Sequence, residues 1–439
     1  MSKNRFQSYA LKPDILDIIH KLKFKEPTPI QQRVIPAALR GESLIGQSHT
    51  GSGKTHSYLI PIFNDLESSK EEIQYVITTP TRELAVQIYD EVRKMIQLAD
   101  KENEWRAKLV IGGTDKQKIA EKLKRPPQMI VGTPGRILDL VKDEAMDVFT
   151  ARALVMDEAD LMIDLDLIQE VDQILLRMKP DIQLMVFSAT IPEKLKPFLK
   201  KYMENPSYIS IDDQGPAPEK LEHRLIPLRH RRVSDLIEEI SGLINPYLAL
   251  IFVNKKDHAD ELAEQLMEQG LETGVIHGGL SPRERKRILK ELKNLRYQYI
   301  VATDLAARGI DIPGVSHVIN AEMPKDPEFY IHRAGRTARA GLEGTTISFY
   351  TDEDIPVIQK LEKSGITFTN IDIKDGEWVQ AKAWNQRNTR QKKENELDEK
   401  AWNMVKKPKK VKPGYKKKMK RQAENIKKKL KHNKNRRKK

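Results

Sequence analysis

The sequence predicts an α/β protein with two tandem parallel-sheet domains, joined by a short linker and followed by a basic tail. Short apolar runs rich in β-branched residues alternate with longer segments of helical periodicity in both halves of the 439-residue chain. This pattern is typical of parallel sheets covered by helices on both faces. Residues 212–220, DDQGPAPEK, interrupt it with Pro and Gly. We therefore expect an N-terminal flank at 1–24, domains at 25–211 and 221–375, and the tail at 376–439.

Short apolar runs predict the strands of each domain. Those of the first half are 43–46, 75–79, 108–111, 129–132, 153–156 and 184–187, and those of the second are 223–227, 248–253, 273–276, 299–302, 317–319 and 345–349. A helix is predicted at 256–269, where the apolar residues are Ala259, Leu262, Ala263, Leu266 and Met267. Their spacing places them on one face, which a helix packed against a sheet requires.

Composition excludes several classes of protein. Apolar residues make up 39% of the chain and charged residues 32%, so large cores are compatible with a very polar surface. No run approaches the roughly 18 apolar residues of a membrane span, and the N-terminus lacks the apolar core of a secretory signal. The absence of Cys excludes disulfides and Cys-based metal sites. We expect a cytoplasmic protein with no membrane partner.

The positive charge is concentrated at the C-terminus. The net charge of the chain is +14, but residues 406–439 contain 19 Lys and Arg against the single acid Glu424, which leaves −4 for residues 1–405. Such a segment buries too little apolar surface to offset the entropy of ordering it, so we expect it to be disordered when free. Its charge density favours nucleic-acid binding. A tail that only improves solubility is the alternative, and a nuclear-localisation signal would also fit in a eukaryotic protein.

A nucleotide-binding loop is predicted after the first strand. The segment 48–55 reads S-H-T-G-S-G-K-T before a helical pattern at 56–66, close to the phosphate-binding motif G-x-x-x-x-G-K-T. Small residues let backbone N–H groups surround phosphate oxygens, while the helix N-terminus adds positive potential. Lys54 would neutralise phosphate charge and Thr55 would hold Mg²⁺. The predicted nucleotide-binding residues here are Ser48, His49, Thr50, Gly51, Ser52, Gly53, Lys54 and Thr55. A Gly-rich turn with a solvated lysine is the alternative.

An acidic motif follows another predicted strand. Asp157-Glu158-Ala159-Asp160 comes directly after 153–156, at the edge where α/β sheets bind ligands. Asp157 would hold Mg²⁺ and Glu158 would activate the attacking water. Acidic clusters are usually solvated surface, but with Lys54 this one completes a phosphate cradle, a metal ligand and a base. We therefore expect ATP and Mg²⁺ to bind here.

The ordered motifs of residues 6–375 resemble those of the DEAD-box RNA helicases of superfamily 2. Phe24 and the segment 27–31, PTPIQ, are similar to the family's Q motif, and Phe6 stands at the place of its isolated aromatic residue. The resemblance implies two RecA-like domains. It also implies that Gln31 reads the adenine edge beside Phe6 and Phe24, which would make the enzyme prefer ATP.

The resemblance also implies residues that bind RNA and couple the two domains. The RNA-binding residues would be Pro80, Thr81, Arg82, Gly112, Gly113, Thr133, Pro134, Gly135, Arg136, Arg285 and Thr303. The coupling residues would be Asp160, Ser188, Thr190, His332 and Arg333, with Arg333 contacting the Asp-Glu-Ala-Asp segment. Arg336 and Arg339 would be arginine fingers that reach the γ-phosphate on closure, a task suited to a permanently charged guanidinium. Asp311 would contact the ribose.

Several positions differ from the commonest family pattern. Ser48 and His49 lie in the phosphate loop, Lys23 precedes Phe24, and Ala338 lies between the fingers. Pro282 stands where the family usually has Gln, which leaves one RNA or coupling contact of the second domain open.

The implied mechanism is ATP-driven closure of two domains, which bends one RNA strand and expels its partner. The overall form is similar to the bacterial cold-shock branch of the family, with a compact core and a short basic extension. We expect little sequence preference, a monomeric core, and partners among ribosomal particles or RNA-decay proteins. A low-turnover RNA clamp and a DNA-translocating motor are the alternatives.

Overall fold

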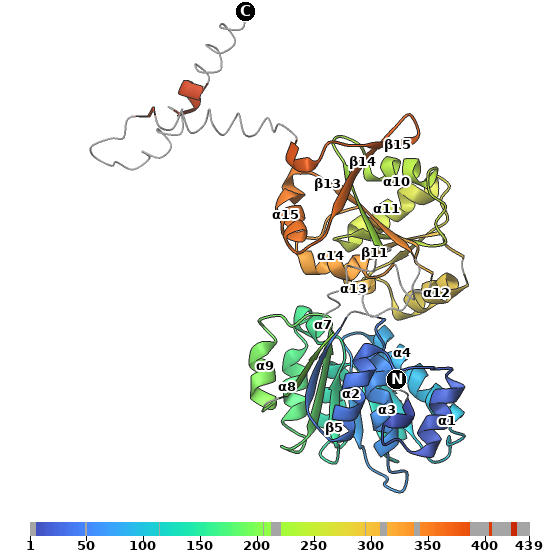
Figure 1. Ribbon diagram of the computed structural model, residues 1–439. Helices are drawn as coiled ribbons and strands as arrows, with labels where there is room; N and C mark the ends of the chain where they lie inside the picture. The colour runs from blue at the N-terminus through green and yellow to red at the C-terminus, as the bar shows by residue number, and fades with distance from the viewer. Residues whose placement is uncertain are drawn as a thin grey trace, which may run out of the picture. The chain divides into compact units, whose positions relative to one another are not determined.

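The computed structural model describes residues 6–48, 51–113, 115–204, 206–211, 221–294, 296–307, 314–337, 343–386, 404–405 and 423–427. These residues form two α/β domains, each with its own sheet (Figure 1), which confirms the predicted fold class. The predicted linker 212–220 and most of the tail lie outside the described residues. Each of the predicted strands is present, with ends displaced by two residues at most.

The N-terminal domain contains a seven-stranded sheet in the order β3-β4-β2-β5-β6-β1-β7. Its strands are β1 (Leu44–Gln47), β2 (Tyr75–Thr78), β3 (Ala107–Val110), β4 (Met129–Gly132), β5 (Ala153–Met156), β6 (Gln183–Ser188) and β7 (Ser207–Ser210). All of them pair in parallel. Strand β7 was not predicted, because its sequence SYIS is half polar and leaves Tyr208 exposed. The carboxyl ends of β5, β6 and β1 therefore lie side by side.

Alternate residues of each central strand face opposite layers of helices. Val155 packs into one apolar cluster, while Leu154 and Met156 pack into another. The first cluster includes residues of α1 (Pro13–Lys21), α2 (Pro29–Leu39), α3 (Lys54–Asp65) and α4 (Arg82–Leu98). The second includes residues of α5 (Lys116–Leu123), α6 (Pro134–Lys142), α7 (Ala159–Asp164), α8 (Ile168–Leu175) and α9 (Lys196–Tyr202). A short 3₁₀ helix, η1 (Phe6–Ser8), precedes them. Burial on both faces explains the nearly continuous apolar runs.

The C-terminal domain contains an eight-stranded sheet in the order β10-β11-β9-β12-β13-β8-β14-β15. Its strands are β8 (Leu221–Pro227), β9 (Ala249–Val253), β10 (Thr273–Ile276), β11 (Tyr299–Thr303), β12 (His317–Asn320), β13 (Gly344–Tyr350), β14 (Phe368–Lys374) and β15 (Glu377–Gln380). The helices are α10 (Val233–Ser241), α11 (Lys256–Glu268), α12 (Pro282–Lys293), α13 (Asp304–Ala307), α14 (Pro327–Ala334), α15 (Ile355–Lys363), η2 (Asp352–Asp354) and η3 (Trp384–Gln386). Strands β8 to β13 pair in parallel.

The predicted C-terminal boundary at residue 375 is wrong. Strands β14 and β15 extend this sheet to Gln380. They were missed because FTNIDIK and EWVQ mix apolar and polar residues, as edge strands with one wet face do. The C-terminal domain therefore extends at least to Gln380.

Candidate active site

The carboxyl ends of three adjacent strands bring the nucleotide motifs together. The phosphate loop follows β1, the acidic motif follows β5, and Ser188 ends β6 between them. The backbone N–H of Ser48 donates to the carbonyl of Ser188 at 3.1 Å, and that of Asp157 donates to the carbonyl of Thr78 at 3.0 Å. Loops that leave one sheet edge in register are thus held close before any ligand binds.

The phosphate loop turns through glycines and ends at Lys54. Gly51 and Gly53 have φ angles of +87° and +96°, a region that L-residues with a Cβ rarely adopt. Lys54 begins α3 and is only 6% exposed, and its Nζ donates to the carbonyl of Ser48 at 2.9 Å. The same Nζ lies 3.4 Å from Oε1 of Glu158. Burial opposes the charge of Lys54, but the carboxylates of Glu158 and Asp157 outweigh it and raise the pKa.

The acidic motif forms a buried carboxylate pair. Burial, followed by the charge of Glu158, raises the pKa of Asp157 to about 6. Burial alone would also raise the pKa of Glu158, but the ammonium of Lys54 holds it below its usual range. Glu158 has a φ of +53° at the start of α7, so the chain turns sharply there. The two carboxylates therefore share one site but have opposite pKa shifts, as acid–base machinery requires.

Both oxygens of Asp157 accept hydrogen bonds within the domain. Oδ1 accepts from the backbone N–H of Glu158 at 2.9 Å, and Oδ2 accepts from the hydroxyl of Tyr58 at 2.8 Å. Tyr58 is a site residue that the sequence motifs did not indicate. It lies in an apolar stretch of α3, where a buried aromatic residue is expected on packing grounds alone.

The donor chemistry of this site fits Mg²⁺. Among the described residues there is no group of three or more His, Asp or Glu side chains that could enclose a metal ion. Mg²⁺ does not need one, because it usually takes one or two protein oxygens with water and substrate phosphates. The carboxylate of Asp157 and the hydroxyl of Thr55 are hard oxygen donors of this kind. A cation would also relieve the desolvation that raises the pKa of Asp157.

The Q-motif residues lie next to the phosphate loop. Gln31 Nε2 donates to the carbonyl of Gly53 at 3.2 Å, and its Oε1 accepts from the backbone N–H of Thr28 at 3.0 Å. The ring of Phe24 meets that of His56 edge-on at 4.8 Å. Phe6 is buried in the apolar cluster with its ring 6.3 Å from that of Tyr9. Gln31 is thus linked to the loop, while the adenine contacts of all three Q-motif residues stay predictions.

The coupling residues of the N-terminal domain form one hydrogen-bonded group. The backbone N–H of Asp160 donates to Ser188 Oγ at 3.0 Å. Asp160 Oδ2 accepts from the backbone N–H and the hydroxyl of Thr190, at 3.1 and 3.2 Å. The end of the acidic motif is therefore tied to the loop that follows β6.

The predicted RNA-binding residues of this domain gather at the ends of β2, β3 and β4, which are neighbours in the sheet. Thr81 caps α4 by accepting from the backbone N–H of Leu84 at 3.3 Å, and Arg82 begins that helix. The guanidinium of Arg82 lies so close to Gly112 that a Cβ there would be 2.9 Å from it. Pro80 precedes the cap, Gly113 follows Gly112 with a φ of +83°, and Thr133, Pro134, Gly135 and Arg136 begin α6. The contacts with RNA themselves stay predictions.

One prediction for the C-terminal domain is wrong. Arg333 is 1% exposed, and its guanidinium donates to Asp304, Asn320, Asn254 and the carbonyl of Glu322. These bonds use all five of its N–H groups, so none remains for the Asp-Glu-Ala-Asp segment. The residue owes its place to packing within its own domain.

The other C-terminal residues are placed as follows. Thr303 ends β11, and Arg285 lies on α12 with a bond to the carbonyl of Ala306 at 3.1 Å. His332 lies on α14, and Arg336 follows its end with a buried side chain. His49, Thr50, Asp311, Ala338 and Arg339 lie outside the described residues, as does the side chain of Pro282.

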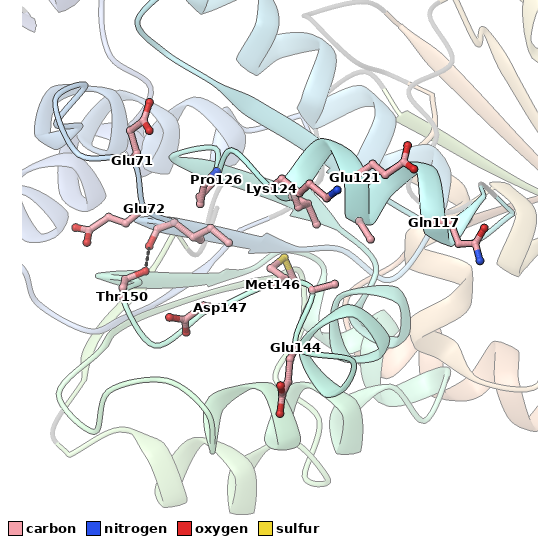
Figure 2. A pocket seen from close by; sticks show the side chains of 14 residues that line it. Glu71, Glu72, Gln117, Glu121, Lys124, Pro126, Glu144, Met146, Asp147 and Thr150 are labelled. Carbon is pink, nitrogen blue, oxygen red and sulfur yellow. Dashed lines mark hydrogen bonds between the residues drawn. The ribbon is translucent and has the colours of Figure 1, made fainter.

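A hollow of about 730 Å³ in the N-terminal domain contains none of these motifs (Figure 2). Acidic residues including Glu71, Glu121 and Glu144 rim it, and Met146 is part of its apolar floor. An acidic rim repels phosphates, so size alone does not identify the nucleotide site.

A phosphate loop beside a buried acidic pair, on a parallel sheet accompanied by a second such sheet, defines a nucleotide-dependent motor of the P-loop class. Residues 28–198 match the family model of the DEAD/DEAH box helicases, and residues 232–341 match that of the helicase conserved C-terminal domain. The chain is 53% identical to the DEAD-box ATP-dependent RNA helicase CshB of Bacillus subtilis over 99% of each chain. It is 50% identical to CshB of Listeria monocytogenes over 95% of this chain and 96% of the relative. The chain belongs to the DEAD-box ATP-dependent RNA helicases.

Solved structures of the family share the fold. Dbp5 of S. cerevisiae, bound to RNA and ADP BeF3, matches 84% of this chain and 96% of its own with a TM-score of 0.76 and 29% identity. Mss116p, bound to ssRNA and AMP-PNP, matches 91% of this chain and 83% of its own with a TM-score of 0.74 and 25% identity. The predicted family, fold and enzyme class are confirmed. No described helix is both long and apolar enough to cross a membrane.

Proposed function

We propose that this enzyme unwinds short RNA duplexes and remodels RNA–protein complexes through ATP-driven closure of its two domains. The observation that carries the residue assignments is the buried cluster of Lys54, Asp157 and Glu158 at one sheet edge. A cation, a metal-binding carboxylate and a base in one site are the parts that phosphoryl transfer to water needs.

Each residue of the cluster has a distinct role in this proposal. Lys54 exchanges its bond to the Ser48 carbonyl for phosphate oxygens of ATP. Thr55 and Asp157 hold Mg²⁺, which supplies neutralisation of phosphate charge when it is bound. Glu158, held ionised by Lys54, orients the attacking water and accepts its proton.

The phosphate loop and the Q motif hold the rest of the nucleotide. Ser48, His49, Thr50, Gly51, Ser52 and Gly53 surround the phosphates, and Gln31, Phe24 and Phe6 form the adenine side. The bond from Gln31 to the carbonyl of Gly53 supports this arrangement, because it connects the adenine side to the loop. An amide presents both a donor and an acceptor, so it discriminates adenine from guanine.

Closure completes the site in this mechanism. Arg336 and Arg339 reach the γ-phosphate and Asp311 the ribose, while His332 and the group of Asp160, Ser188 and Thr190 report nucleotide state to the RNA-binding loops. The bonds from Thr190 to Asp160 support the last step, since they join the acidic motif directly to the loop after β6.

The substrate is structured RNA, bound with little sequence preference. The relatives Dbp5 and Mss116p have been captured with RNA, which supports an RNA-binding cleft in this chain too. The RNA-binding loops end in backbone N–H groups, hydroxyls and arginines, which suit phosphates and sugars. The basic tail adds an electrostatic anchor.

The similarity to CshB proteins supports a role in cold adaptation. Such a role is also physically reasonable, because RNA duplexes become more stable as temperature falls and need more help to unwind. Ribosome assembly and RNA turnover are the processes proposed for it, with ribosomal particles or RNA-decay proteins as partners. We propose a monomeric core acting in the cytoplasm.

The test compares ATP hydrolysis with RNA, with DNA and without nucleic acid. The parent, Glu158→Gln and the control Glu121→Gln, a change of an exposed acid on α5, are measured side by side. RNA should stimulate the parent and the control strongly, and Glu158→Gln should lose at least about a hundredfold of the turnover. Equal stimulation by DNA contradicts the substrate. Unchanged turnover in Glu158→Gln contradicts the base and favours another water-activating group.

A further inference from the structure

The hydroxyl of Tyr58 holds Asp157, one of the two side chains that the proposed function assigns to Mg²⁺. Tyr58 lies on α3 three residues after Thr55, so the two share a helix face. Its hydroxyl donates to Oδ2 of Asp157 at 2.8 Å. A single buried oxygen therefore connects α3 to the loop after β5.

The environment of Tyr58 keeps this connection intact. The side chain is fully buried, and its ring packs 5.0 Å from that of Phe187 on β6, between β1 and β5. A phenol has an ordinary pKa of about 10, so it is protonated at neutral pH. The group therefore stays protonated and acts as a donor to Asp157.

The connection restricts how Asp157 can move. With Oδ1 held by the backbone N–H of Glu158 and Oδ2 held by Tyr58, both ends of the carboxylate are restrained. A restrained first ligand costs less conformational entropy when a metal ion binds, and partners of this kind commonly tune metal affinity by tenfold or more. Without the phenol, Asp157 could turn away from the loop or accept a bond from Lys54 instead.

We propose that Tyr58 is a positioning residue for the metal: its hydroxyl holds the carboxylate of Asp157 in the orientation that binds the ion, so that nucleotide binds with Mg²⁺ rather than without it. This inference rests on the proposed role of Asp157. It adds a determinant of metal dependence that lies outside the phosphate loop and the acidic motif.

The test measures ADP binding to the full-length chain by calorimetry, once with Mg²⁺ and once with a chelator. The ratio of the two affinities measures the contribution of Mg²⁺ to ADP binding, separately from the contacts that the protein makes with the nucleotide itself. Tyr58→Phe should lower this ratio about tenfold, the smallest loss expected for one hydrogen bond to a charged group, and should leave metal-free ADP binding unchanged. The ring and its contact with Phe187 remain, so the domain should fold, which thermal unfolding checks.

Tyr75→Phe is the matched control. Tyr75 is also buried, and its hydroxyl also donates to a carboxylate, Oδ2 of Asp65 at 2.9 Å, but neither residue belongs to the nucleotide motifs. This variant should keep the parent ratio. If Tyr58→Phe keeps it too, or weakens binding equally with and without Mg²⁺, the hydroxyl is structural and the inference is overturned.

Asp157→Asn separates this inference from the proposed function beneath it. If Asp157→Asn keeps the parent ratio, Asp157 is not a metal ligand, and that part of the proposed function is contradicted together with this inference. A lowered ratio in Asp157→Asn with a parent ratio in Tyr58→Phe overturns the inference alone. The double variant should be no worse than Asp157→Asn, because both changes act through one carboxylate. An additive loss would show that Tyr58 acts by another route.

Discussion

Arg333 and Asp304 form a two-point ion pair in the interior of the C-terminal domain, with Nε–Oδ1 and Nη2–Oδ2 distances of 2.5 and 2.7 Å. The remaining donors of the guanidinium reach Asn254, Asn320 and the carbonyl of Glu322, and its carbon lies 5.1 Å from the centre of the Phe252 ring. These partners follow or end β11, β9 and β12, which are adjacent. Arg333 therefore connects α14 through hydrogen bonds to the carboxyl ends of three adjacent strands.

Loss of this ion pair should destabilise the C-terminal domain strongly. Asp304→Asn leaves the buried guanidinium without its counter-ion, and breaking a buried pair typically costs about 3–5 kcal/mol. Urea-dependent hydrogen exchange, which resolves peptides of β11 and β12, would report the free energy of unfolding of this domain. Arg232→Ala, which breaks an exposed pair with Asp235, should cost under about 1 kcal/mol. A similar small loss in Asp304→Asn would mean that solvent reaches Arg333.

Gly53 should prove essential for nucleotide binding because of both its φ angle and its neighbours. A Cβ at Gly53 would lie 2.8 Å from Gln31 Nε2 and from Thr28 Oγ1, and its φ is +96°. Gly53→Ala should therefore push Gln31 out of place and lower ATP affinity about tenfold, since the strain of a positive φ is about 1–3 kcal/mol. Binding of a fluorescent ATP analogue measures this.

Gly41→Ala is the control for backbone strain. Gly41 also has a positive φ, +75°, but a Cβ there would meet nothing within 4 Å. Both variants should lose stability, and only Gly53→Ala should lose ATP affinity. Equal affinities in the two variants would show that the contact between the loop and the Q motif does not matter for binding.

Apolar runs predicted the strands well because both faces of these sheets are covered. Strands such as β5 and β9 are buried along their whole length, so four or five consecutive apolar residues mark them. Strands β7, β14 and β15 lie at or near sheet edges and carry polar residues among the apolar ones. Their pattern is too short and too mixed to separate from a loop.

The candidate site could be predicted wherever a motif has a fixed spacing. Lys54 and Asp157 belong to such motifs, and the structure places both at one sheet edge. Tyr58 could not be found in this way, because its proposed role depends on a hydrogen bond to Asp157, which lies 99 residues away in the sequence. Arg333 was assigned to the wrong partner for a similar reason: Asp304, Asn254 and Asn320 are far apart in sequence and meet only through the order of the strands.

Thr190 should affect the coupling of ATP hydrolysis to unwinding more than hydrolysis itself. Thr190→Val removes the hydroxyl bond to Asp160 but leaves the bond from the backbone N–H. The acidic motif keeps its place, so ATPase activity should stay within about threefold of the parent, while duplex unwinding should fall about tenfold, the effect of one hydrogen bond to a carboxylate. Parallel ATPase and strand-displacement assays test this. A proportional fall in both activities would place Thr190 in the chemistry instead.

The stability of the C-terminal domain should fall as the pH drops below about 6.5. Burial lowers the pKa of His223 to about 4 in the folded state, where its ring accepts or donates at Nδ1 to the hydroxyl of Tyr330 at 2.9 Å. Between these two pH values the unfolded chain binds a proton that the folded domain does not. Unfolding therefore becomes easier by about 1.4 kcal/mol per pH unit in this window, and levels off below pH 4.

His223→Asn should flatten this pH dependence, since an amide can replace Nδ1 toward Tyr330 without titrating. The measurement is the free energy of unfolding from urea-dependent hydrogen exchange of β8 and β13 peptides between about pH 7 and about pH 5. This range covers the upper part of the window between the unfolded pKa of about 6.5 and the folded pKa of about 4. An identical slope in parent and variant would assign the effect to other groups.

The basic tail should determine how tightly RNA is held and leave the chemistry of the core unchanged. The chain is truncated after Gln386, which leaves β15 and η3 intact. The truncated enzyme should keep its ATPase rate at saturating RNA but need a higher RNA concentration. It should also show a shallower dependence of binding on salt, since each lost phosphate contact lowers the slope by about 0.7–0.9.

A chain whose tail is replaced by a neutral Gly/Ser segment of equal length is the control, and it should behave like the truncated enzyme. If the neutral tail restores the parent RNA requirement and salt slope, charge is not the cause and the tail acts by its length alone.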